Sequence, residues 1–174
     1  MSSQEKASRS HWIEWCALTT SITAVTLSAY QAYTLKEHNY ISVEPRVNSY
    51  LSLKDNYKMI IFNNGLGPAY IDKITFYENG KEIDGNILHA LAKQGIPPYC
   101  ATAGTPRPND SLKTGEEIVL VDIHDNKECT TPRLIFTTLQ PPNTSFDYQI
   151  DFSSIYGKKF SYRYSLNKQE SIPN

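Results

Sequence analysis

The sequence predicts a mainly β protein: a single N-terminal transmembrane helix followed by an immunoglobulin-like antiparallel β-sandwich with one short helix insertion. Three features indicate this class: a long uncharged stretch near the N-terminus, apolar residues that alternate with polar ones further on, and turn residues between the alternating segments. The 174 residues carry 17 basic and 18 acidic side chains, a net charge of -1. This balance excludes a strongly basic binder of nucleic acid polymers, and the length fits one ordinary domain.

The predicted membrane helix covers residues 12–35. No charged residue occurs between 15 and 35, and at about 1.5 Å per residue such a helix is long enough for a hydrocarbon core of ~30 Å. Trp12 and Tyr33 lie near opposite ends, as in an interfacial aromatic belt. The run exceeds the ~7–15 residues of a signal-peptide core, so we expect an uncleaved signal-anchor and a single pass through the lipid bilayer.

The side of the membrane that holds the domain stays open, because basic residues flank the helix evenly. Small residues recur every four positions at Ala24, Ser28 and Ala32, the spacing that lets two helices approach closely. With Gln31 as a hydrogen-bonding group across the contact, these residues predict a homo-oligomer or a membrane partner. The alternative is that the serines and threonines bond back to carbonyls of their own helix.

The remaining chain predicts short strands connected by turns. In chain order, the expected strands are 41–53, 59–62, 70–77, 81–83, 118–123, 134–139, 146–152 and 160–166. Asn79-Gly80 is a typical hairpin dipeptide. One helix is expected between Asn86, which can cap its start, and Gly95, which can end it. A proline-rich loop over 97–110 follows, and its length marks it as a candidate ligand-binding edge. A closed barrel is the alternative architecture.

These elements divide the chain into five segments. They are an N-terminal tail at 1–11, the transmembrane helix at 12–35, a juxtamembrane linker at 36–39, the β-sandwich at 40–166 and a C-terminal tail at 167–174. Cys100 and Cys129 both fall in loops of the sandwich. They predict either a disulfide, which requires an oxidising compartment, or two free thiols.

Three motifs carry a resemblance to a group of proteins. His38-Asn39-Tyr40-Ile41-Ser42-Val43-Glu44-Pro45 follows the predicted helix, Asn63-Asn64-Gly65-Leu66-Gly67-Pro68-Ala69 follows a strand, and Ser154-Ile155-Tyr156-Gly157 forms a turn. Together they resemble small, mostly uncharacterised bacterial proteins with one N-terminal transmembrane helix and a β-sandwich. The resemblance implies a bacterial inner-membrane location and brings no catalytic residue.

Few residues suggest chemistry. The turn containing Asn63, Asn64, Gly65 and Gly67 could bind an anion through backbone N–H groups. The alternative is a structural turn, in which the glycines supply positive φ angles. Asp122 and His124 could form half of a metal site, but no third ligand has a suitable spacing. We therefore expect no enzyme, cofactor or metal centre.

The expected function is that of a non-enzymatic, membrane-anchored binding module that associates through its helix and binds a protein or small ligand with its sandwich. The alternative is a bacterial membrane effector with a role in antiviral defence, whose cytosolic sandwich senses a signal such as a nucleotide messenger and triggers membrane perturbation. A domain outside the cytoplasm with a Cys100–Cys129 bridge favours the first, and free thiols in the cytosol favour the second.

Overall fold

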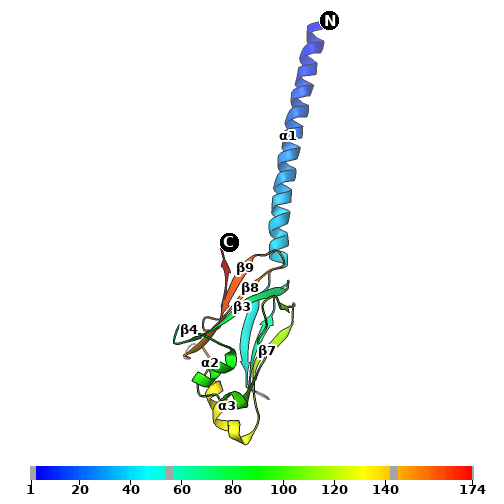
Figure 1. The fold of residues 1–174 in the computed structure, drawn as a ribbon. Helices are drawn as coiled ribbons and strands as arrows, with labels where there is room; N and C mark the ends of the chain where they lie inside the picture. The colour runs from blue at the N-terminus through cyan, green and yellow to red at the C-terminus, as the bar shows by residue number, and fades with distance from the viewer. Residues whose placement is uncertain (1–2, 54–56, 142–144, 174) are drawn as a thin grey trace. The chain divides into compact units, whose positions relative to one another are not determined.

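The computed structural model describes residues 3–53, 57–141 and 145–173 (Figure 1). The chain divides into two compact units, residues 1–41 and 42–174. Among the described residues, helix α1 (Ser3–Ser42) makes up the first unit and ends at the start of the second, which contains ten short strands and two further α-helices. Residues 1–2 of the predicted N-terminal tail and residue 174 of the predicted C-terminal tail lie outside the described residues.

The predicted transmembrane helix over 12–35 is not supported. Within the described residues, no helix is both long enough and apolar enough to cross a membrane. Length is not the obstacle, because α1 has 40 residues. The polar content of the helix is the physical reason: eight hydroxyl and amide residues lower the hydropathy of the uncharged stretch. They are Thr19, Thr20, Ser21, Thr23, Thr26, Ser28, Gln31 and Thr34.

Helix α1 also extends further than expected. It includes the predicted linker at 36–39 and continues to Ser42, so Ile41 lies in a helix and not in the first strand. All seven serine and threonine hydroxyls between 19 and 34 donate to carbonyls three or four residues earlier in the same helix. For example, Ser28 donates to the Ala24 carbonyl at 2.8 Å.

The second unit is mainly β, with two antiparallel sheets, as the sequence predicts. The four-stranded sheet has the order β1 (Val47–Ser52), β2 (Tyr57–Asn63), β7 (Glu117–Ile123) and β5 (Ala101–Ala103). The six-stranded sheet has the order β10 (Lys168–Ile172), β9 (Lys159–Arg163), β8 (Phe146–Ser153), β3 (Ala69–Glu78) and β4 (Lys81–Ile83), and β6 (Ser111–Leu112) also pairs with β3.

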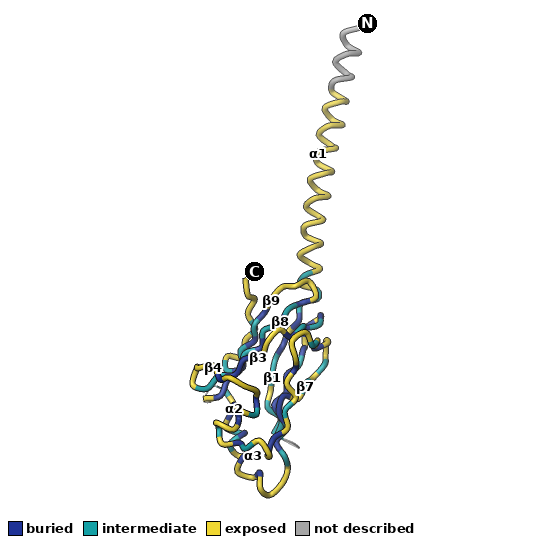
Figure 2. Tube along the Cα trace, viewed as in Figure 1, coloured by how far each residue is buried: buried dark blue, intermediate teal, exposed yellow. Residues whose placement is uncertain are grey.

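Alternation of residues along the strands builds a core between the two sheets. In β8, Phe146, Tyr148, Ile150 and Phe152 are fully buried, and Figure 2 traces the buried positions through both sheets. They pack in one cluster with residues of the other sheet, among them Met59 and Leu120. The outer face of β8 and β9 carries the polar residues between them, including Gln149, Ser161 and Arg163.

The predicted strand over 134–139 is wrong, because residues 134–137 lie in helix α3 (Thr130–Thr137) and residues 138–139 lie in the turn after it. Its short apolar run does not distinguish a helix from a strand by itself. Phe136 is buried whereas Leu134 is 63% exposed, so tertiary packing selects one helical face. Helix α2 (Ile87–Lys93) has the predicted cap, with Asn86 accepting from the His89 N–H, and Gly95 follows its end with a φ of +87°.

Two other segments differ from expectation. The predicted C-terminal tail contains strand β10, which pairs with β9 from Lys168 opposite Arg163 to Ile172 opposite Lys159. The proline-rich segment after α2 is not a continuous loop. It contains the 3-10 helix η1 (Pro98–Cys100) and strand β5, which pairs with the edge of β7.

Candidate functional site

The candidate site lies where the edges of the two sheets meet, and the turn after β2 positions it. Asn63 ends this strand and is fully buried. Its side-chain oxygen accepts hydrogen bonds from the N–H groups of Arg46 (3.0 Å) and Gly65 (2.9 Å). Its amide nitrogen donates to the carbonyls of Gly67 (2.8 Å) and Leu112 (3.0 Å). The side chain of Asn63 is thus fully used in holding the turn together.

Glycine is required at positions 65 and 67 because a Cβ atom would have no room there, and not because of the φ angles. Neither has a positive φ, so the expected reason for these two glycines is wrong. A Cβ at Gly67 would lie 2.0 Å from the Val43 carbonyl oxygen, and one at Gly65 would lie 2.3 Å from the Arg46 nitrogen. The turn therefore packs directly against the backbone that leads into β1.

The turn also uses its backbone N–H groups internally. Asn64 donates to the Arg46 carbonyl at 2.9 Å, and Leu66 donates to the Glu44 carbonyl at 3.1 Å. Together with the Gly65 bond to Asn63, these contacts engage the N–H groups of Asn64, Gly65 and Leu66 within the protein. The turn presents the side chains of Asn64 and Leu66 to solvent, because both residues are exposed.

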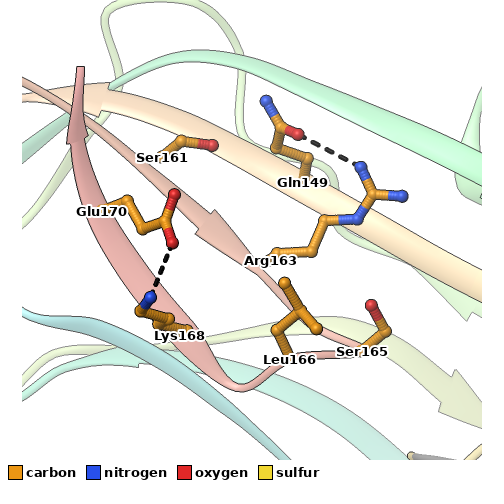
Figure 3. A pocket seen from close by; sticks show the side chains of 7 residues that line it. All are labelled: Gln149, Ser161, Arg163, Ser165, Leu166, Lys168 and Glu170. Atoms are coloured by element: carbon orange, nitrogen blue, oxygen red, sulfur yellow. Dashed lines mark hydrogen bonds and ion pairs between the residues drawn. The ribbon is translucent and has the colours of Figure 1, made fainter. Parts of the chain in front are cut away.

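Two hollows share Lys168. The outer hollow, of about 360 Å³, is lined by Gln149, Ser161, Arg163, Ser165, Leu166, Lys168 and Glu170 (Figure 3). The rim hollow, of about 280 Å³, is lined by Glu44, Arg46, Asn48, Asn64, Asn167, Lys168 and Gln169. The first lies on the solvent face of β8, β9 and β10, and the second lies between the segment that enters β1 and the start of β10.

Arg163 is the cation of the outer hollow with the most partners among the described residues, whereas Lys168 pairs with Glu170. The Arg163 Nε forms an ion pair with the Asp147 carboxylate. Another guanidinium nitrogen donates to the Gln149 side-chain oxygen at 3.2 Å, as Figure 3 shows. The guanidinium carbon lies 3.9 Å from the ring centroid of Tyr77. Asp147 also accepts from the N–H and hydroxyl of Ser165, at 2.9 and 2.8 Å. These contacts hold Arg163 in one orientation on the sheet.

Gln169 connects the two sheets below the rim hollow. Its side-chain oxygen accepts from the Val47 N–H at 3.1 Å, and its side-chain nitrogen donates to the Pro45 carbonyl at 2.9 Å. A neighbouring parallel strand would bond to the same two backbone groups. The side chain of Gln169 therefore takes the place of a strand at the outer edge of this segment.

Buried tyrosines support the site from the core. Desolvation by burial raises the pKa of Tyr162 to about 12, although a backbone hydrogen bond from Ser49 opposes the shift. Burial also raises the pKa values of Tyr148 and Tyr164. All three hydroxyls therefore stay protonated at neutral pH, and the Tyr162 hydroxyl donates to the Asn167 side-chain oxygen at 3.0 Å.

A disulfide joins Cys100 to Cys129, and both cysteines are fully buried. Their Cα atoms are 5.5 Å apart, and the bridge connects η1 to the 3-10 helix η2 (Lys127–Cys129) that precedes α3. It thereby fixes part of the proline-rich segment, which lines neither hollow described above.

The carboxylate of Asp122 and the ring of His124 have separate partners. Asp122 forms an ion pair with Lys58 at 3.2 Å, and His124 bonds to the Thr102 hydroxyl at 2.8 Å. Within the described residues, no three histidine, cysteine or acidic side chains gather as a metal site would require.

The sequence alone did not single out Arg46, Arg163 or Lys168. Arg46 is far from the other two in the chain, and the pairing of β9 with β10 places Arg163 opposite Lys168. The available signal was the outward parity of Arg163 on a strand whose alternate residues, Phe160 and Tyr162, are buried. Of the predicted binding residues, Asn64 lines the rim hollow, whereas Asn63, Gly65 and Gly67 hold the turn behind it.

Comparison with known proteins does not add an identification: no protein-family model, curated protein or solved structure that was compared with the chain matches it. The resemblance to small bacterial membrane proteins therefore stays a prediction.

Proposed function

We propose that this protein is a non-enzymatic binding module whose partner contacts the sandwich at the outer and rim hollows. The observation that carries the proposal is the pair of hollows around Lys168, in which neighbouring contacts fix polar side chains in place. Arg163 is held by Asp147, Gln149 and the Tyr77 ring. Side chains that are ordered before binding lose less conformational entropy when a partner arrives.

The Cys100–Cys129 bridge supports a place of action outside the cytoplasm. Structural disulfides persist in oxidising compartments and are rare where thiols are kept reduced. This favours the binding module over an effector with a cytosolic sandwich. Alkylation of intact cells, followed by denaturation in a second alkylating reagent, should leave Cys100 and Cys129 unmodified until a reductant is added. Modification without reductant would contradict the proposed compartment.

A photo-crosslinking residue at Leu166 tests the binding function itself. Leu166 is 68% exposed and lines the outer hollow, so its replacement should join the chain to its partner in living cells. The matched control is Lys81, which is exposed in the hairpin at the opposite edge of the same sheet. Crosslinks from position 166 but not from position 81 are expected. Equal yields from the two positions, or none from position 166, would refute the proposed binding surface.

We further propose that α1 associates with α1 of a second copy. Large apolar side chains are exposed along the helix, including Trp12 (73%), Val25 (69%) and Tyr33 (65%). Its hydroxyls are satisfied by their own helix, as for Ser28 and the Ala24 carbonyl, so covering them costs little. The small residues Ala24, Ser28 and Ala32 give two such helices room to approach.

Bulky substitutions test this helix contact. Ala24→Leu and Ser28→Leu should each lower the molar mass of the full-length protein measured by light scattering. Val25→Leu changes the next residue, which points about 100° away from Ala24, and should leave the mass unchanged. Equal masses for all three variants would exclude the contact through Ala24 and Ser28.

A further inference from the structure

In the side-chain amides that line the rim hollow, most of the oxygens already accept a hydrogen bond from another group of the protein. The Tyr162 hydroxyl donates to the Asn167 side-chain oxygen at 3.0 Å. Because this contact uses the side-chain oxygen of Asn167, the amide nitrogen of the same side chain remains available to donate to a ligand. Gln169 uses both ends of its amide on the backbone groups of Val47 and Pro45.

The two asparagines on the other side of the rim hollow also favour donation. The amide nitrogen of Asn48 donates to the Asn64 side-chain oxygen at 2.9 Å. Asn64 is exposed, and its own amide nitrogen remains to donate into the hollow. The network thus presents N–H groups from Asn64 and Asn167 beside the cations Arg46 and Lys168.

The charges of the rim hollow leave one cation without a counterion. Glu44 forms an ion pair with Lys158 at 3.1 Å, and Lys168 forms one with Glu170 at 2.8 Å. Within the described part of the chain, the guanidinium of Arg46 has no hydrogen bond or ion pair, and this residue is exposed. Arg46 is nevertheless anchored, because its backbone N–H and carbonyl bond to Asn63 and Asn64.

We propose that the rim hollow binds a carboxylate group of the partner, with Arg46 as its main ligand and the amides of Asn64 and Asn167 as further donors. A planar guanidinium matches the two oxygens of a carboxylate, and the single unpaired positive charge matches its single negative charge. A phosphate dianion would need a second free cation. The inference rests on the proposed binding function and assigns the chemistry that the rim hollow recognises.

Chemical-shift titration of the isotopically labelled full-length protein tests this assignment. Sodium acetate, added at constant ionic strength with chloride as the balancing anion, should shift the side-chain amide signals of Asn64 and Asn167 in a saturable manner. Arg46→Gln retains hydrogen-bond donors but removes the charge, and it should weaken acetate binding on the order of tenfold. Asn167→Asp should weaken it as well, because it places a second carboxylate in the hollow.

Arg107→Gln is the matched control, since Arg107 is an exposed arginine that lines neither hollow. This variant should bind acetate as the unmodified protein does. Three results would overturn the assignment: no saturable shift with acetate, an unchanged affinity in Arg46→Gln, or tighter binding of inorganic phosphate than of acetate.

The crosslinking experiment at Leu166 keeps this inference separate from the proposed function. Crosslinks without acetate binding would remove only the carboxylate assignment and leave the binding module intact. Acetate binding without crosslinks would support the carboxylate site and contradict the partner surface at the outer hollow.

Discussion

The side-chain oxygen of Gln169 accepts a hydrogen bond from the Val47 N–H at 3.1 Å and thereby connects the edge strands of the two sheets. Its amide nitrogen binds the Pro45 carbonyl two residues earlier. One side chain on β10 thus satisfies a donor and an acceptor that would otherwise lie at an unpaired sheet edge. The same contact forms one wall of the rim hollow, so the closure of the sandwich and the geometry of the candidate site depend on each other.

Gln169→Ala should lower the free energy of unfolding by about 1–3 kcal/mol, because the Val47 N–H and the Pro45 carbonyl lose their partners in a partly buried position. Urea denaturation measures this loss. Ser171→Ala is a control on the same strand, at an exposed position, and should change stability little. Equal stability of the two variants would show that the Gln169 contacts are replaceable by water.

Removal of the disulfide should destabilise the sandwich by about 3–4 kcal/mol, since the bridge closes a loop with a sequence separation of 29 residues and restricts the unfolded chain. The Cys100→Ala/Cys129→Ala variant and the reduced protein should unfold at similar, lower urea concentrations. Cys16→Ser removes the exposed cysteine of α1, and in this variant the sandwich should unfold at the same urea concentration as in the unmodified protein.

Gly67→Ala should cost at least about 2 kcal/mol, because the added Cβ would lie 2.0 Å from a backbone oxygen that cannot rotate away. Gly80→Asn provides the contrast. Gly80 has a φ of +78° and open space around its Cα, and asparagine tolerates this conformation better than other residues. Thermal unfolding should separate the two substitutions clearly, and a neutral Gly67→Ala would contradict the close packing of the turn against Val43.

Stability should fall at alkaline pH because of the buried tyrosines. An unfolded tyrosine loses its proton near pH 10, whereas burial raises the pKa of Tyr162 to about 12 and also raises those of Tyr148 and Tyr164. Between these values the unfolded state binds fewer protons than the folded state, so the free energy of unfolding decreases as the pH rises. The stability that the buried, protonated tyrosines contribute is fully present below about pH 10.

Absorbance of tyrosinate during alkaline titration checks this expectation. Tyr148, Tyr162 and Tyr164 should ionise only above pH 10 or together with unfolding. A single transition that includes all the tyrosines near pH 10 while the protein stays folded would contradict the burial of these hydroxyls.

The sequence by itself determined the elements whose signals are local. The alternation in 146–152 placed Phe146, Tyr148, Ile150 and Phe152 in the core, and the Asn79-Gly80 dipeptide placed the hairpin between β3 and β4. Asn86 and Gly95 marked the limits of α2, because a capping side chain and a left-handed residue act within one helical turn.

Only the tertiary structure decided what depends on residues far apart in the chain. The segment 134–139 carries an apolar run compatible with either helix or strand, and packing of Phe136 selected the helix. Strand β10 has no apolar alternation, and its pairing with β9 comes from the register of the sheet.

The candidate site belongs to this second group. Arg46, Asn64 and Asn167 share a hollow because the turn after β2 packs against the entry to β1 and because β10 folds back beside it. Which of their amide groups remain free depends on hydrogen bonds to Tyr162 and Asn48, and no pattern within one segment encodes those contacts. Local sequence therefore determines which elements form, whereas long-range pairing determines which polar groups remain available for a partner.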